Sequence, residues 1–137
     1  MIDHMSTYAI NYEVTKSFYT QALKPLGAEL VFEMALDDDE DLPGRRICAF
    51  GPGRAIFWVI ETIVEYTPRH TAFSATNESE VNAFYEAALG AGGTDHGAPG
   101  LRPIYHPNYY GAFVLDPDGN NVEAVYHGEN WGTKPET

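Results

Sequence analysis

The chain has 137 residues, of which 44% are hydrophobic and 13% aromatic, enough to form one folded domain with its own core. Eight Lys and Arg against twenty Asp and Glu give a net charge of −12, which opposes binding to nucleic acid or to an anionic membrane, because both are polyanions. The single cysteine, Cys48, excludes an internal disulfide, and the sequence shows no secretion signal or membrane-spanning run, so we expect a cytoplasmic protein.

The first half of the sequence predicts one helix among four strands. Residues 2–10 are typical of a short strand, and Asn11 after them can cap a helix over residues 12–26 with its side-chain oxygen. Val14 and Phe18 belong to the apolar stripe expected on this helix. The other predicted strands are residues 28–34, 46–50 and 55–61, the last two joined by a turn at residues 51–53.

The second half predicts the same order of elements. Asn77 can cap a helix that runs to about residue 91, with Glu80 at the position of a capping box. Residues 97–109 are rich in Pro and Gly, which favours a loop with a short extended segment. The predicted strands of this half are residues 69–75, 110–115 and 121–127, the last two around a turn at residues 116–119.

The two halves are an internal repeat. A constant offset of 66 residues aligns His4 with His70 and Asn11 with Asn77, without a gap. We therefore expect a single domain over residues 1–128, made of two β-α-β-β-β repeats at about 1–62 and 68–128, with a C-terminal tail at 129–137. Paired side by side, two such units predict an α+β fold in which mixed sheets form a half-open barrel with the helices outside.

Two histidines and one glutamate are the candidate metal ligands. His4 and His70 occupy equivalent first-strand positions, and they face each other if both side chains point inward. Glu123 stands within an apolar run of the last strand, where a carboxylate is costly to bury without a partner such as a cation. Two histidines and a carboxylate around open positions form the facial arrangement of catalytic divalent metals. The alternatives are core histidines and a pairing of Glu123 with Arg102.

The sequence resembles the vicinal oxygen chelate superfamily, the glyoxalase, bleomycin-resistance protein and dioxygenase group. The resemblance runs through MIDH, SFY, HTAF, VNAFYEAAL and YHPNYYGAFVLDPDGNNVEAV, and it covers nearly the whole chain. It implies two β-α-β-β-β modules, a homodimer, and a divalent metal (Zn, Fe, Mn or Ni) held by residues of the first and last strands. At the matching positions these ligands are His4, His70 and Glu123.

One departure from the family pattern bears on the reaction. Glyoxalase I enzymes of this family generally have a fourth ligand, the carboxylate equivalent to Glu123 in the other module. The offset of 66 places Phe57 there, which cannot bind a metal, and Glu61 lies further along the strand. The three-ligand set resembles extradiol dioxygenases and fosfomycin-resistance thiol transferases more than glyoxalase I. Extradiol enzymes are longer, however, and the basic residues expected around a phosphonate are scarce here.

We therefore expect a small metalloenzyme in which the metal chelates oxygens of a small-molecule substrate and stabilises an enolate or oxyanion, by lyase, isomerase or oxygenase chemistry. The alternative is a non-catalytic protein of the bleomycin-resistance type that binds a cationic aromatic drug or antibiotic, which suits the acidic charge. The two modules pair either within one chain or between the two chains of a dimer. In the second case, His4 of one chain lies next to His70 and Glu123 of the other. The candidate substrate-binding residues, in or beside a loop that also carries Tyr109, are Arg102, Tyr105, His106 and Tyr110.

Overall fold

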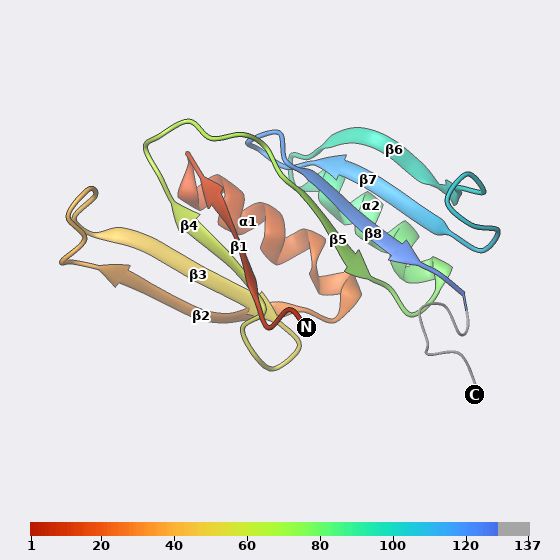
Figure 1. The fold of residues 1–137 in the computed structure, drawn as a ribbon, viewed down its shortest axis with the longest axis horizontal. Helices are drawn as coiled ribbons and strands as arrows, with labels where there is room; N and C mark the ends of the chain where they lie inside the picture. The colour runs from red at the N-terminus through yellow and green to blue at the C-terminus, as the bar shows by residue number, and fades with distance from the viewer. Residues whose placement is uncertain (129–137) are drawn as a thin grey trace.

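The computed structural model describes residues 1–128, and the expected C-terminal tail at 129–137 lies outside the described residues. Two four-stranded sheets lie next to each other, each with a helix from the same half of the chain (Figure 1). This arrangement confirms the predicted α+β fold with two unclosed mixed sheets. No helix of residues 1–128 is long and apolar enough to cross a membrane.

The first half forms the first sheet in the strand order β1-β4-β3-β2. The edge strand β1 runs parallel to β4, and the other neighbours are antiparallel. Its elements are β1 (Met5–Ala9), α1 (Tyr12–Ala22), the 3-10 helix η1 (Lys24–Leu26), β2 (Glu29–Leu36), β3 (Arg45–Gly51) and β4 (Phe57–Glu61).

The second half forms the second sheet in the equivalent order β5-β8-β7-β6, with β5 parallel to β8. The segment expected to be a loop from residue 97 begins inside a strand, since β6 extends to Leu101. Irregularities in its pairing with β7 accommodate the Gly and Pro residues of this strand. The elements are β5 (His70–Ser74), α2 (Glu78–Gly90), β6 (Thr94–Leu101), β7 (Tyr110–Leu115) and β8 (Asn121–Tyr126).

The helices begin where the sequence predicts, and α1 ends earlier than predicted. The side chains of Asn11 and Asn77 cap α1 and α2, respectively. The first helix ends at Ala22 and tightens into η1, because Pro25 has no N–H group to continue an α-helix. Val14, expected on the apolar face of α1, is 47% exposed, so the prediction of its burial was wrong.

One hydrophobic core extends across both halves. Phe18 and Tyr19 of α1 are buried in the same cluster as Phe84 of α2 and Val114 of β7. The buried Tyr19 hydroxyl donates a 2.6 Å hydrogen bond to Asp116, which lies 97 residues further along the chain. The two modules of one chain therefore share their interior through the helices and the sheet faces that the helices cover.

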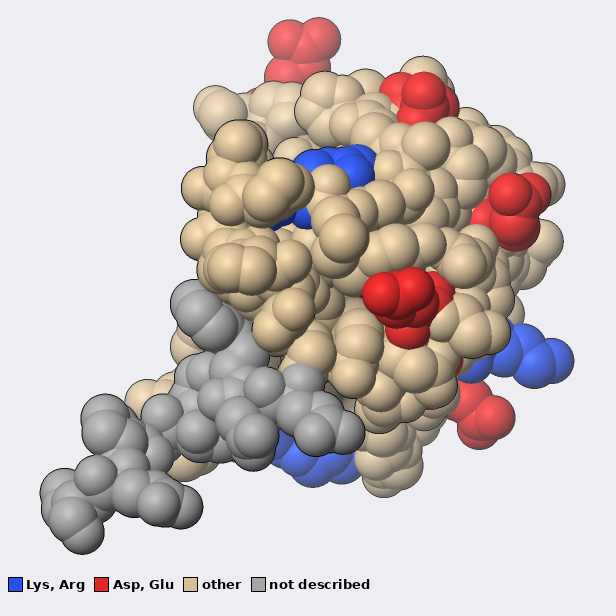
Figure 2. Space-filling model, turned by 90° about the vertical axis from the view of Figure 1, so that its right-hand side faces the viewer, with Lys and Arg blue, Asp and Glu red and all other residues tan. Residues whose placement is uncertain are grey.

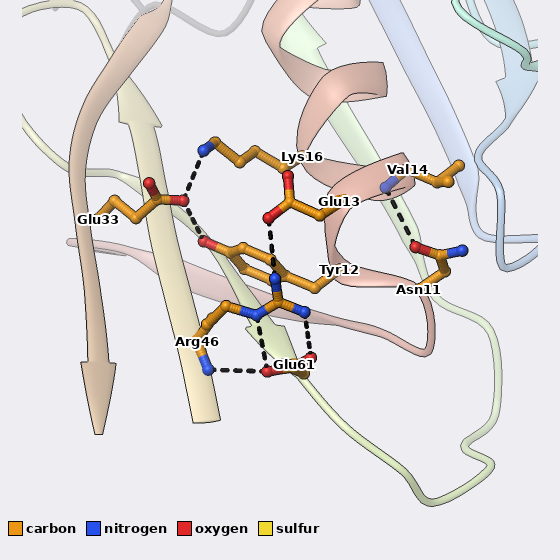
Figure 3. Close-up of polar contacts among 8 residues, drawn as sticks. All are labelled: Asn11, Tyr12, Glu13, Val14, Lys16, Glu33, Arg46 and Glu61. Atoms are coloured by element: carbon orange, nitrogen blue, oxygen red, sulfur yellow. Dashed lines mark hydrogen bonds and ion pairs between the residues drawn. The ribbon is translucent and has the colours of Figure 1, made fainter. Parts of the chain in front are cut away.

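Acidic groups project from the surface, in keeping with the net charge of −12 (Figure 2). Several of them are paired where α1 faces β2 and β3 (Figure 3). The Tyr12 hydroxyl donates to Glu33, and Lys16 forms a 2.7 Å ion pair with the same carboxylate. Arg46 lies over the Tyr12 ring and forms an ion pair with Glu61 of β4. The contacts of Glu33 fasten the outer strand β2 to the helix through polar groups, and those of Arg46 do the same for β3.

Candidate metal and substrate site

The face of each sheet opposite its helix carries the candidate ligands. In the second sheet, strand register puts Phe113 of β7 beside Glu123 of β8, and Glu123 beside Ala72 of β5. Side chains alternate between the two faces of a strand, so His70 shares the face of Ala72. This face, turned away from α2, is called the open face of the second sheet below.

His70 and Glu123 are brought together on this face. The Nε2 atom of His70 lies 2.8 Å from Oε1 of Glu123, and the Tyr109 hydroxyl donates a hydrogen bond to Oε2. Glu123 is 1% exposed, and its burial raises the pKa of its carboxyl above the ordinary value, while His70 and then Arg102 act in the opposite direction. Arg102 forms no ion pair with Glu123 within residues 1–128, so the direct partners of this carboxylate are His70 and Tyr109.

His4 lies apart from this pair within a single chain. Its Nδ1 atom is 2.7 Å from Oδ1 of Asp3, and its ring stands edge-on to Trp58 at a centroid distance of 6.4 Å. Among residues 1–128, no group of three or more His, Cys, Asp or Glu side chains is placed to hold a metal ion. One chain therefore presents two of the three predicted ligands as a contacting pair.

The position equivalent to Glu123 in the first module is Trp58, not Phe57 as the offset of 66 predicted. Ser6 pairs with Trp58 between β1 and β4, just as Ala72 pairs with Glu123 between β5 and β8. The first strands keep the offset of 66, whereas the last strands, matched through their pairing with the first strands, are offset by 65. An indole cannot bind a metal either, so the expected absence of a fourth ligand is unchanged. Glu61 is engaged by Arg46.

The candidate substrate-binding residues separate into two groups. Arg102 and Tyr105 line a cavity of about 340 Å³ on the open face, together with Phe113 and Asn121. The other two lie elsewhere. The Tyr110 hydroxyl donates a 2.7 Å hydrogen bond to Asn82 of α2, and the His106 ring is hydrogen-bonded to that of His127 at 2.9 Å.

Sequence reasoning missed Phe113 and Asn121, although a signal for both exists. The turn at residues 116–119 was predicted, and pairing outward from it matches Leu115 with Asn121 and then Phe113 with Glu123. Residues paired in this way share a face of the sheet. Counting from the turn therefore places Phe113 beside the candidate ligand.

Comparisons with known proteins agree with this fold. The family model for the Glyoxalase/Bleomycin resistance protein/Dioxygenase superfamily matches residues 1–124. A solved glyoxalase/bleomycin resistance protein from Albidiferax ferrireducens T118 is 24% identical, with a TM-score of 0.69, over 91% of this chain and 97% of that one. A lactoylglutathione lyase from Agrobacterium tumefaciens is 21% identical, with a TM-score of 0.63, over 97% of each chain.

A glyoxalase I variant from Zea mays is 20% identical, with a TM-score of 0.65, over 90% of this chain and 44% of that longer one. No curated protein matches the chain. At these identities the solved structures share the fold, whereas the family model spans almost all of the described residues. The chain thus belongs to the Glyoxalase/Bleomycin resistance protein/Dioxygenase superfamily, the group that its sequence resembles.

Proposed function

We propose that this protein is a small metal-dependent enzyme in which His70 and Glu123 of one chain and His4 of a second copy hold a divalent ion. The observation that carries the proposal is the contact between His70 and Glu123, a carboxylate that is 1% exposed on a sheet face without a helix. Burying a carboxylate is unfavourable unless it is paired, and a metal ion is a partner that also uses the adjacent imidazole.

The pair fits a divalent ion in chemistry and in spacing. Imidazole nitrogen and carboxylate oxygen are ligands of Zn, Fe, Mn and Ni. Two atoms that each lie about 2.1 Å from one ion, at right angles, are about 3 Å apart. The measured separation of His70 Nε2 and Glu123 Oε1 is 2.8 Å. Both atoms can therefore serve the same ion with little movement.

The third ligand is proposed to come from a second chain. His4 precedes β1 at the position equivalent to His70, and strand β2 at the other edge of the same sheet carries exposed apolar side chains, including Phe32 and Met34. A twofold dimer that sets the first sheet of one copy against the second sheet of the other covers these residues. Such an interface is self-complementary and assembles two sites at once.

A divalent ion held by these residues supplies Lewis-acid stabilisation of negative charge on a substrate oxygen. Glu123 is fixed through Tyr109, which engages one carboxylate oxygen and leaves the other toward His70. Trp58 stands at the position equivalent to Glu123 in the first module, and its indole would not bind the ion. The set supports lyase, isomerase or oxygenase chemistry on a substrate with two neighbouring oxygens.

Metal analysis combined with subunit mixing tests this proposal. We expect the wild type to hold about one divalent ion per chain, and His4→Ala and Glu123→Ala each to lose it. A heterodimer of these two variants, isolated with two different affinity tags, regains one intact site, because one chain supplies His4 and the other supplies His70 and Glu123. Its metal content is therefore expected to be about one ion per dimer.

Two other results contradict the proposal in different ways. If both variants lack metal and the heterodimer also lacks it, the three ligands come from one chain. If the wild type takes up no metal under any loading condition, the protein is better described as a non-catalytic small-molecule binder of the same superfamily.

A further inference from the structure

Arg102 is the one Lys or Arg between residues 70 and 128 of the sequence. It forms no ion pair within the described part of the chain, whereas Arg45, Arg46 and Arg54 each pair with a carboxylate. Its guanidinium donates one hydrogen bond of 2.5 Å, to the carbonyl oxygen of Ala98. A planar cation with several N–H donors is thus held in place without an ion pair to a carboxylate of residues 1–128.

Two glycines of β6 make room for this guanidinium. A Cβ atom at Gly100 would lie 3.1 Å from Nη1 of Arg102, and one at Gly97 would lie 2.9 Å from the ring of Phe113. The guanidinium carbon stands 5.6 Å from the centre of the Phe113 ring. Arg102 is therefore folded back over β6 and Phe113, where it is half-buried, instead of extending into solvent.

The guanidinium forms part of the wall of the open-face cavity of about 340 Å³. The side of the molecule that carries the β6–β7 connection shows recessed basic atoms among mostly uncharged residues (Figure 2). The rings of Phe113 and Tyr105 in this mixed polar and apolar wall favour a small ligand with a flat body. Arg102 beside them favours a carboxylate on that ligand, because the guanidinium fork matches a carboxylate with two parallel hydrogen bonds. The other residues that line the cavity are His96, Ile104, Tyr105, Phe113 and Asn121.

The cavity adjoins the candidate ligand pair. The Phe113 ring lies 6.4 Å from the His70 ring and pairs in register with Glu123. Asn121 pairs in register with His70, and its Oδ1 atom is buried with no hydrogen-bond partner among the described residues. A ligand lying across Phe113 can therefore reach from Arg102 to the ligand pair.

We propose that the substrate is a small carboxylic acid with a flat, apolar body, whose carboxylate binds Arg102 while its oxygens at the other end face His70 and Glu123. The position of those oxygens rests on the proposed metal function. The carboxylate subsite rests on the cavity and on Arg102 alone, so the two parts can be tested separately.

Three probes that differ only in one end group test the subsite: 4-hydroxyphenylacetate, its neutral amide, and tyramine, which is a cation. Binding is measured by calorimetry on the full-length protein. We expect the acid to bind at least about 10-fold more tightly than the amide, and tyramine to bind most weakly. Arg102→Gln is expected to abolish the preference for the acid, and Arg102→Lys, which keeps the charge but not the fork, to retain part of it.

Arg69→Gln is the matched control. Arg69 also lies over an aromatic ring, that of Tyr8 at 5.5 Å, and it too has no ion pair within residues 1–128, but it does not line the cavity. This variant should keep the preference of the wild type. Circular dichroism confirms that each variant is folded.

The outcomes separate this inference from the proposed function. An acid preference that survives in Arg102→Gln, or a wild type that prefers tyramine, overturns the carboxylate subsite. An acid preference that persists in His70→Ala, together with a wild type that takes up no metal, supports the subsite and contradicts the proposed metal function.

Discussion

Among individual residues, Tyr109 controls how Glu123 is presented. Its hydroxyl engages Oε2 of the carboxylate, while His70 lies 2.8 Å from Oε1. Gly111 makes this possible, because a Cβ atom there would lie 3.1 Å from the Tyr109 ring and 3.4 Å from Oε2 of Glu123. Each carboxylate oxygen thus has its own partner, which fixes the orientation of the proposed metal ligand.

Replacing Tyr109 should weaken metal binding without removing it. In Tyr109→Phe, Oε2 of Glu123 loses its hydrogen-bond donor and the carboxylate loses its fixed orientation. We expect the affinity for a divalent ion to fall by about 10-fold, as is typical when a group that orients a ligand is removed. Competition with a chromophoric chelator measures this change. Tyr110→Phe is the control, because the Tyr110 hydroxyl binds Asn82 instead, and it should retain the wild-type affinity.

Tyr19 stabilises a buried carboxylate. Asp116 is 4% exposed, and burial raises the pKa of its carboxyl above the ordinary value, while the hydrogen bond from Tyr19 lowers it. Because the pKa of Asp116 is higher in the folded state than in the unfolded state, the protein loses stability as the pH rises from the unfolded-state pKa through the folded-state pKa. Tyr19→Phe removes the hydrogen bond that lowers the pKa of Asp116, so the loss of stability with rising pH should become larger.

We therefore expect Tyr19→Phe to lower the free energy of unfolding by about 2 kcal/mol at neutral pH. The loss should be smaller near pH 4, where Asp116 is more protonated in both proteins. Urea denaturation of the wild type and the variant at several pH values measures the difference. A loss that does not change with pH would contradict the assigned role of Asp116.

Among the elements, the two helix starts offer a built-in comparison. Oδ1 of Asn77 accepts a 2.8 Å hydrogen bond from the Glu80 amide, and Glu80 in turn accepts one from Thr76. Oδ1 of Asn11 accepts a longer bond of 3.3 Å, from the Val14 amide. The cap of α2 is thus the more complete of the two.

Asn77→Ala should accordingly destabilise the protein more than Asn11→Ala does. The expected loss in the free energy of unfolding is about 1 kcal/mol for Asn77→Ala. Chemical denaturation of the two variants side by side gives the comparison. Equal losses would mean that the geometry of the two caps does not determine their contributions.

The sequence predicts those features of the elements that depend on neighbouring residues. Both helix starts follow from local Asn side chains, and the second β-hairpin follows from its turn. Which side of α1 faces the core does not follow from local sequence. Tyr12 and Tyr19 are buried instead of Val14, and this choice depends on contacts with distant strands. Likewise, β6 is a strand despite its Gly and Pro residues because it pairs with β7, and a local pattern does not contain this pairing.

For the whole molecule, the repeat predicts two modules but not how they meet. The equivalence of His4 and His70 suggested that the two histidines face each other. Within one chain, however, the modules meet through their helices in the shared core, and among residues 1–128 His4 does not join His70 and Glu123 in a group that could hold a metal. The contact between His70 and Glu123 was within reach of the sequence, since both lie in predicted strands of one module. The surroundings of Arg102 and Tyr109 were not, because they depend on the path of residues 102–109 over the sheet.

The connection between the modules is less important for holding them together than the contacts that cross between them. Ile63 and Val64 of this connection are 70% and 67% exposed. In contrast, two carboxylates of the second half accept hydrogen bonds from the first half: Asp118 from the Ile10 amide and Asp116 from the Tyr19 hydroxyl. Cutting the chain between residues 63 and 64 leaves these contacts and the common core intact. Two separately produced polypeptides, residues 1–63 and 64–137, should therefore recombine into a native-like complex, which size-exclusion chromatography and circular dichroism of the mixture would detect.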